Sequence, residues 1–129
     1  MGQINVTPAV CMIDAHLLRE YRAIPGFFAR QRNSMVRASI APSNFTNGRH
    51  NGRFFADKVA FVRYRYGELF SELRNRGYHV NKSHFESVLY SAANIAADKQ
   101  GQYKPTPEDI YNNMHYLTGL TIGLSTMVA

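Results

Sequence analysis

Basic side chains stand at two places in this chain from which they could bind an anion. Arg19 and Arg22 are three residues apart, so they project from one side of an expected helix near its end. Arg49, His50 and Arg53 follow in a segment punctuated by Asn-Gly pairs, where backbone N–H groups can also bind phosphate. Guanidinium groups match phosphate oxygens in bidentate pairs. The alternative for both groups is a solvated surface with ordinary ion pairs.

The distribution of charge favours the anion-binding interpretation. The 129-residue chain has a net charge of +6, and eleven of its fifteen basic residues are arginine. Between Arg19 and Lys82 there are thirteen basic and four acidic residues, a local net charge of +9, whereas the rest of the chain sums to −3. Such an excess predicts an anionic partner: nucleic acid, a free nucleotide or a membrane surface. Four further arginines either extend this footprint or only make the surface soluble: Arg63, Arg65, Arg74 and Arg76.

Other chemistries are not expected. His79, His84 and His115 lack the spacing of metal ligands, so we expect neither a metal site nor another cofactor. Cys11 is the single cysteine, and its distance of five residues from His16 is off-register for a catalytic pair on a helix. The sequence shows no signal-peptide pattern and no apolar run of the roughly 18 to 20 residues that span a membrane. We therefore expect a cytoplasmic protein without a membrane partner.

Apolar spacing predicts the elements that position these residues. A first helix is expected over residues 8–22, because Thr7-Pro8 can begin a helix and Pro25-Gly26 can end one. A short second helix is expected over 27–37, followed by a long basic loop over 38–53. The clearest helix is predicted over 54–76, where apolar residues recur at spacings of four and three.

Two more helices complete an all-α expectation. A capping box at Ser83 to Glu86 begins the fourth helix, which ends by Gly101. Thr106-Pro107 begins the fifth helix, which runs to about Thr118 and leaves an uncharged tail. We expect residues 1–129 to form a single compact domain of four to five helices with one long basic loop. The tail could pack on the core or join a second copy in a homo-oligomer.

Several motifs carry a resemblance to a known family. Residues Ile4-Asn5-Val6-Thr7 and the run from Asp14 to Pro25 resemble the beginning of the pyrimidine-dimer DNA glycosylases (endonuclease V) of phages and algal viruses. Further segments resemble that family in the same order along most of the chain: 40–43, 50–61, 73–78 and 101–105. Family members are compact all-α enzymes that flip a nucleotide out of damaged DNA and attack the sugar with their N-terminal amine.

The resemblance implies roles for individual positions. His16, Tyr21 and Arg22 match residues around the family's active site, with Arg22 at a phosphate-contacting position. The family's catalytic glutamate falls at Ala23, and its N-terminal threonine falls at Gly2. A methyl group can neither hold a proton nor stabilise a charged sugar, and loss of such a group costs about a hundred- to ten-thousand-fold in rate.

Departures from the family pattern favour binding over catalysis. Gln3 and Gly26 fall where the family has two more DNA-contacting arginines, and the family's cationic tail is replaced by the uncharged residues 119–129. Glu20 is the acid nearest to Ala23 along the chain. It is expected either as an exposed partner of an arginine or, if substrate is displaced by a turn, as a replacement catalyst.

Three hypotheses follow. The first is a catalytically degenerate, glycosylase-like protein that sequesters a phosphate-bearing ligand, with a site formed by His16, Arg19, Tyr21, Arg22, Arg49, His50 and Arg53. The second is an active DNA glycosylase and abasic-site lyase that uses Glu20 and the Gly2 amine, which removal of Met1 would free. The third is an adaptor that binds protein through its tail. A phage origin would place the protein in the cytoplasm of a bacterial host.

Overall fold

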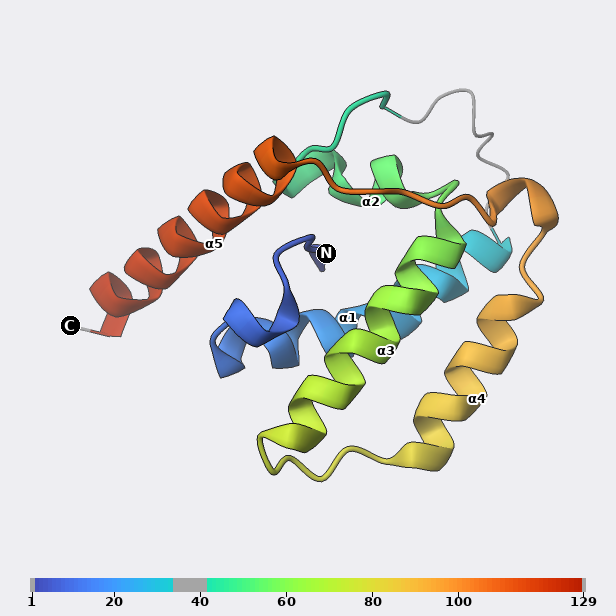
Figure 1. The fold of residues 1–129 in the computed structure, drawn as a ribbon, viewed down its shortest axis with the longest axis horizontal. Coiled ribbons are helices and arrows are strands. Elements are labelled where there is room, and N and C mark those ends of the chain that lie inside the picture. The colour runs from blue at the N-terminus through green and yellow to red at the C-terminus, as the bar shows by residue number, and fades with distance from the viewer. Residues whose placement is uncertain (1, 34–41, 129) are drawn as a thin grey trace.

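Five α-helices and short 3-10 turns make up the computed structural model of this protein (Figure 1). The structure describes residues 2–33 and 42–128, with the side chains of the last helix described as far as Ile122. The α-helices are α1 (Asp14–Asn33), α2 (Asn51–Phe55), α3 (Val59–Asn75), α4 (Lys82–Ala93) and α5 (Pro107–Val128). The 3-10 turns are η1 (Ala9–Cys11), η3 (Gly48–His50) and η4 (Ala97–Lys99). The predicted all-α fold is confirmed, and the described residues contain no strand.

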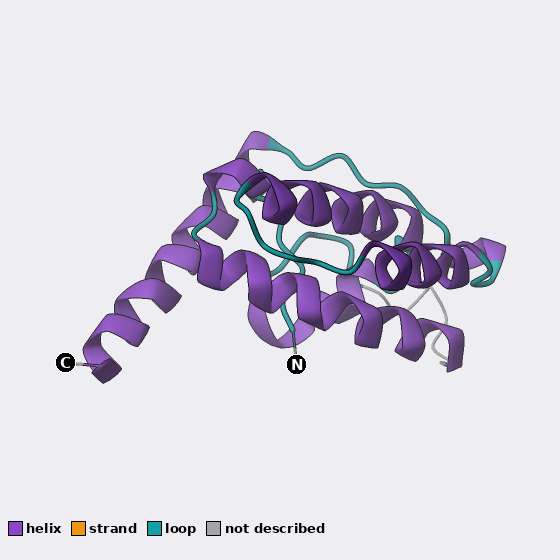
Figure 2. Cartoon of the chain, turned by 90° about the horizontal axis from the view of Figure 1, so that it is seen from below, coloured by secondary structure: helices purple, strands orange, loops and turns teal. Residues whose placement is uncertain are grey.

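The helices form a body from which α5 projects. In Figure 1, α3 and α4 lie side by side and run in opposite directions, and α1 crosses behind α3, its main packing partner. Both views place the C-terminal end of α5 away from the other helices (Figure 2). In the described part of the chain, no helix combines the length and apolar character needed to cross a membrane.

The first helix differs from the sequence expectation at both ends. It begins at Asp14 and not at residue 8, because residues 3–8 are extended and Ala9–Cys11 form η1. It also continues through Pro25 to Asn33, so the expected second helix is its continuation. Phe27 and Phe28 are buried immediately after the proline, and their burial favours helix continuation over a break there. Residues 34–41, where that second helix and the long loop were expected to meet, lie outside the described residues.

The predicted helix over 54–76 is interrupted. Helix α2 ends at Phe55 and α3 begins at Val59, and the break is held by a contact with the distant Gly101. The Gly101 N–H donates to the carbonyl oxygen of Asp57 at 2.9 Å, and the Phe61 N–H donates to the Gly101 carbonyl at 3.3 Å. A Cβ atom on Gly101 would collide with the Asp57 carbonyl oxygen, so this close approach requires glycine.

The last two helices shift their predicted ends. Asn81, and not Ser83, caps α4: its side-chain oxygen accepts from the His84 N–H at 2.8 Å. Helix α4 then ends at Ala93, well before the expected stop at Gly101. Thr106 caps α5 as predicted, but α5 continues past Thr118 to Val128.

The extended N-terminal segment passes through the interior, and side chains satisfy its backbone. The side-chain amide of Asn51 accepts from the Ile4 N–H at 2.7 Å and donates to the Ile4 carbonyl at 2.9 Å. The fully buried Asn113 of α5 accepts from the backbone N–H groups of Val6 and Thr7, each at 2.9 Å. A buried backbone must find such partners because water cannot reach it.

A buried ion pair lies at the centre of this arrangement. Arg65 of α3 donates from Nε and from a terminal nitrogen to the two carboxylate oxygens of Glu20 at 2.9 and 2.8 Å. The side chains of Arg65 and Glu20 are 2% and 1% exposed. Arg65 also donates to the carbonyl of Thr7 at 2.6 Å, and Glu20 accepts from the Asn5 backbone and side chain. Helices α1 and α3 and the N-terminal segment therefore meet at one bidentate pair.

We expect the Glu20→Ala substitution to lower the free energy of unfolding by about 3–5 kcal/mol, because it leaves the Arg65 charge buried without its main partner. Urea denaturation measures this loss. The control is Glu86→Ala, which removes an exposed carboxylate 3.8 Å from Lys82 and should change stability little. Equal urea midpoints of unfolding for Glu20→Ala and Glu86→Ala would show that the buried pair contributes no more to stability than a surface pair.

Candidate functional site

The N-terminus is held between the two groups of basic residues that the sequence indicates. Gly2 lies against Ala23 of α1, so closely that a Cβ atom on Gly2 would collide with the Ala23 methyl carbon. The Gln3 side chain donates to Asn47 at 2.8 Å and accepts from the Gly48 N–H at 2.9 Å. Residues 2 and 3 therefore join the face of α1 next to Arg22 with the segment next to Arg49.

The arginines at this place are exposed to solvent. Arg19 and Arg22 lie on the solvent side of α1, and Arg49, His50 and Arg53 are exposed on η3 and α2. Among the described residues, no carboxylate forms an ion pair with any of these four arginines. Their charges are therefore available to a ligand. We call these five residues, which flank Gly2, the cationic rim.

His16 lies behind the rim, in the packing between α1 and α5. Its ring is 5% exposed, and its Nε2 lies 2.8 Å from the hydroxyl oxygen of Thr121. The Thr121 hydroxyl already donates to the Leu117 carbonyl at 3.0 Å, so His16 Nε2 carries the proton and donates to Thr121. Burial is the main cause that lowers the pKa of His16, and the nearby Arg19 charge acts in the same direction.

Much of the Tyr21 side chain also packs against other residues of the protein. Its ring stacks on Tyr66 of α3 with the ring centroids 4.8 Å apart, and it is only half-buried. Burial raises the pKa of the Tyr21 hydroxyl. Of the seven ligand-binding residues predicted from the sequence, His16 and Tyr21 thus support the fold beneath the rim, whereas the other five face solvent.

The structure places Glu20 in an environment different from the one that the sequence predicts. The prediction of an exposed partner of a nearby arginine is wrong about exposure, because the carboxylate is 1% exposed. Its partner is Arg65, a residue of α3 that sequence reasoning assigned to a binding footprint or to the surface. The signal for a buried Arg65 was its position three residues after Val62 and four before Leu69, both core residues.

The other α3 arginines also separate into different environments. Arg76 is held by Asp14 at 2.7 Å and by Glu72 at 2.9 Å, which fastens the end of α3 to the beginning of α1. Arg74 is exposed and lies 5.4 Å from the centre of the Phe70 ring. Neither Arg76 nor the buried Arg65 is available to extend a binding footprint.

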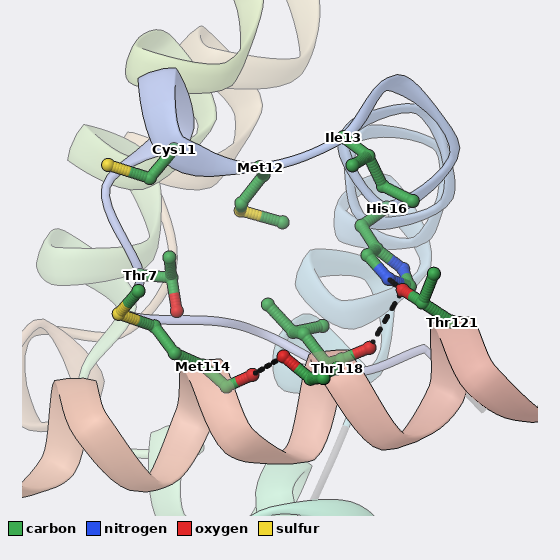
Figure 3. A pocket seen from close by; sticks show the side chains of 9 residues that line it. Thr7, Cys11, Met12, Ile13, His16, Met114, Thr118 and Thr121 are labelled. Atoms are coloured by element: carbon green, nitrogen blue, oxygen red, sulfur yellow. Dashed lines mark hydrogen bonds between the residues drawn. The ribbon is translucent and has the colours of Figure 1, made fainter.

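A groove of about 120 Å³ lies between η1, the beginning of α1 and α5 (Figure 3). Figure 3 shows Met114 and Thr118 of α5 on one side and Met12 and His16 on the other. The described residues contain no cluster of three or more histidine, cysteine or acidic side chains that could hold a metal ion. His16 is the one predicted site residue in the groove, so the groove is separate from the cationic rim.

A second cavity lies closer to the rim. It has a volume of about 20 Å³ and is lined by Gln3, Asn5, His16, Arg19, Glu20, Leu117 and Leu120. This volume is enough for one water molecule among several polar groups, and too small for an organic ligand.

No protein-family model matches this chain. The assignment to the dimer-glycosylase family thus stays a prediction from the motifs. The predicted homo-oligomer also remains untested: α5 continues into the expected tail and Ile122 is 62% exposed, but the side chains beyond it lie outside the described residues.

Because Gly2 packs directly against Ala23, the effects on stability of enlarging residue 2 and of shrinking residue 23 should depend on each other. We expect Gly2→Ala to lower the free energy of unfolding by about 1–3 kcal/mol through overpacking, and Ala23→Gly to relieve part of that loss in the double variant. Denaturant titration of the four proteins measures the coupling. Gly52→Ala is the matched control, because a Cβ atom there meets nothing within 4 Å. Additive single-variant effects would contradict the contact.

His16 predicts a dependence of stability on pH. Its folded-state pKa lies below the ordinary value of 6.5, so the unfolded chain takes up this proton first. The contribution of neutral His16 to the free energy of unfolding is therefore complete above about pH 6.5, and it is lost as the pH falls toward the lower folded-state pKa. Thermal melts from pH 7.5 to 5.0 should therefore fall less steeply for His16→Gln than for the unchanged protein. Parallel curves would exclude this role of His16.

Proposed function

We propose that this protein binds a phosphate-bearing ligand, a nucleotide or a short nucleic acid, on the cationic rim without cleaving it. The observation that carries the proposal is a set of exposed arginines around Gly2 and Gln3 that form no ion pair with any carboxylate in the part of the chain that the structure describes. Arginine without a carboxylate is the group best suited to grip phosphate oxygens. The fixed positions of Gly2 and Gln3 reduce the entropy that a ligand must remove to order the rim.

The environment of the nearest acid supports binding over bond cleavage. Both carboxylate oxygens of Glu20 accept hydrogen bonds from Arg65 and Asn5, so the group has neither solvent access nor spare acceptor capacity for a substrate. Position 23 has only a methyl group, and Gly2 is packed against it. The alternative enzyme, with the Gly2 amine and Glu20 as catalysts, would require the buried pair to open first.

The charge of the chain supports a small ligand over a long duplex. Affinity for duplex DNA rises with the number of phosphates that basic residues neutralise. Residues 110–129, which include most of α5, contain no Lys, Arg, Asp or Glu. The last helix therefore adds no positive charge beyond its first turns, and the unpaired arginines of the rim form a small region that suits a nucleotide or a short strand better than a long duplex.

Isothermal titration calorimetry with mononucleotides, cyclic nucleotides and short oligonucleotides tests the proposal. We expect saturable binding to at least one class, weakened about tenfold or more by Arg22→Gln or Arg49→Gln, because each loses a charge-assisted hydrogen bond. Arg74→Gln, which removes the same charge from the far end of α3, is the matched control. Absence of saturable binding, or equal weakening by all three variants, would refute a site at the rim.

Borohydride trapping separates the binder from the alternative enzyme. With DNA that contains an abasic site, we expect no covalent adduct. A trapped adduct that forms with the unchanged protein would instead support catalysis through the N-terminal amine and overturn the non-catalytic proposal.

A further inference from the structure

One face of α1 extends the cationic rim along the helix. Positions 19, 22, 26 and 30 follow spacings of three, four and four, so they share a single face. All four positions are exposed, and three of them are arginine. Ala23, the residue that Gly2 contacts, belongs to the same face. Among the described residues, no carboxylate pairs with Arg19, Arg22 or Arg30.

Gly26 is the one of these four positions that is not arginine, and it determines where the Arg30 side chain lies. A terminal guanidinium nitrogen of Arg30 lies 3.6 Å from the point that a Cβ atom on Gly26 would occupy. Side chains of an α-helix lean toward its N-terminus, and the bare backbone at Gly26 leaves open the surface over which Arg30 leans. The Arg30 charge therefore lies one turn closer to Ala23 and the N-terminus than its own backbone does.

We propose that Arg30 is a second phosphate-binding residue and that the ligand is a short oligonucleotide strand with at least two phosphates. This inference rests on the proposed function of the rim. Arg22 and Arg30 are eight residues apart, so their backbones lie about 12 Å apart along the helix axis. Because helical side chains lean toward the N-terminus, Arg22 leans in the same direction as Arg30, and the spacing of the two charges follows that of the backbones. One phosphate group is too small to bridge such a row, whereas two phosphates separated by a nucleoside can contact both ends.

The arginine row of α1, formed by Arg19, Arg22 and Arg30, has different surroundings from other basic side chains of the protein. Arg32 lies on a different face of the same helix and donates to the Ser91 hydroxyl of α4 at 2.9 Å. Arg76 is neutralised by two carboxylates. Arg30 instead forms no ion pair with a carboxylate of the described residues, and one of its guanidinium nitrogens lies over Gly26, one turn nearer the rim.

Paired titrations test the inference with probes that differ by one nucleotide. Calorimetry compares thymidine 5′-monophosphate with the 5′-phosphorylated dithymidylate, which carries two phosphates. We expect the unchanged protein to bind the dinucleotide about tenfold or more tightly than the mononucleotide. Arg30→Gln should abolish that advantage and leave mononucleotide binding within about twofold, whereas Arg32→Gln, which removes the same charge from the other face, should leave both affinities unchanged.

Gly26→Glu provides an independent variant that keeps Arg30. A glutamate four residues before an arginine pairs with it on a helix, so Gly26→Glu should neutralise Arg30 in place and also remove the dinucleotide advantage. Gly26→Ala should retain it, because the added methyl group makes an ordinary contact with Arg30. Helical circular dichroism and thermal melts confirm that each variant folds.

The outcomes separate the two proposals. Equal affinity for the two probes, or the same response of Arg30→Gln and Arg32→Gln, overturns the role of Arg30 while leaving a ligand at the rim. Failure of every nucleotide and oligonucleotide to bind the unchanged protein overturns the proposed function and this inference together.

Discussion

The pair between Arg65 and Glu20 is the interaction on which the arrangement depends. It joins α1 to α3, and through Thr7 and Asn5 it also holds the extended segment that passes between them. Charges in a protein interior are costly unless every polar atom finds a partner. Here the cost is offset by the bidentate pair and by hydrogen bonds to the backbone of Thr7 and Asn5. Arg65 also pairs with Glu68 at 3.1 Å, and Glu68 in turn accepts from the Ala9 N–H. The result is a polar centre inside an otherwise aromatic and aliphatic core.

This polar centre explains how the chain can combine a rigid N-terminus with an exposed cationic surface. Of the two acids of α1, Glu20 is buried against Arg65 and Asp14 is paired with Arg76, so no carboxylate of the described residues forms an ion pair with the exposed Arg19, Arg22 or Arg30. Asn51 and Gln3 then bring the η3 and α2 segment to the opposite side of the N-terminus. The same side chains that satisfy a buried backbone therefore determine where the external charges lie.

The sequence predicts the helical class, the apolar stripe of α3 and the cap of α5, because each depends on local spacing. Predictions from the sequence are wrong where contacts between residues far apart in the chain determine where a helix ends. Pro25 suggests a helix end, yet the burial of Phe27 and Phe28 favours continuation. Gly101 interrupts the helix before Val59 through a contact with Asp57, some forty residues away in sequence, that no periodicity encodes. The exposed members of the candidate site were found from charge alone, whereas the structural role of Glu20 depends on Arg65, a partner 45 residues away.

The side chain of Asn113 has a consequence for how the chain acquires its shape. One amide of the last helix accepts from Val6 and Thr7, more than a hundred residues earlier, and donates to Asn5. Contacts of such long range slow the search for the native topology, because a large loop must close before they form. During synthesis, Asn5, Val6 and Thr7 must wait without these partners until Asn113 has left the ribosome. The interior is therefore completed only by a late encounter between its earliest and latest segments.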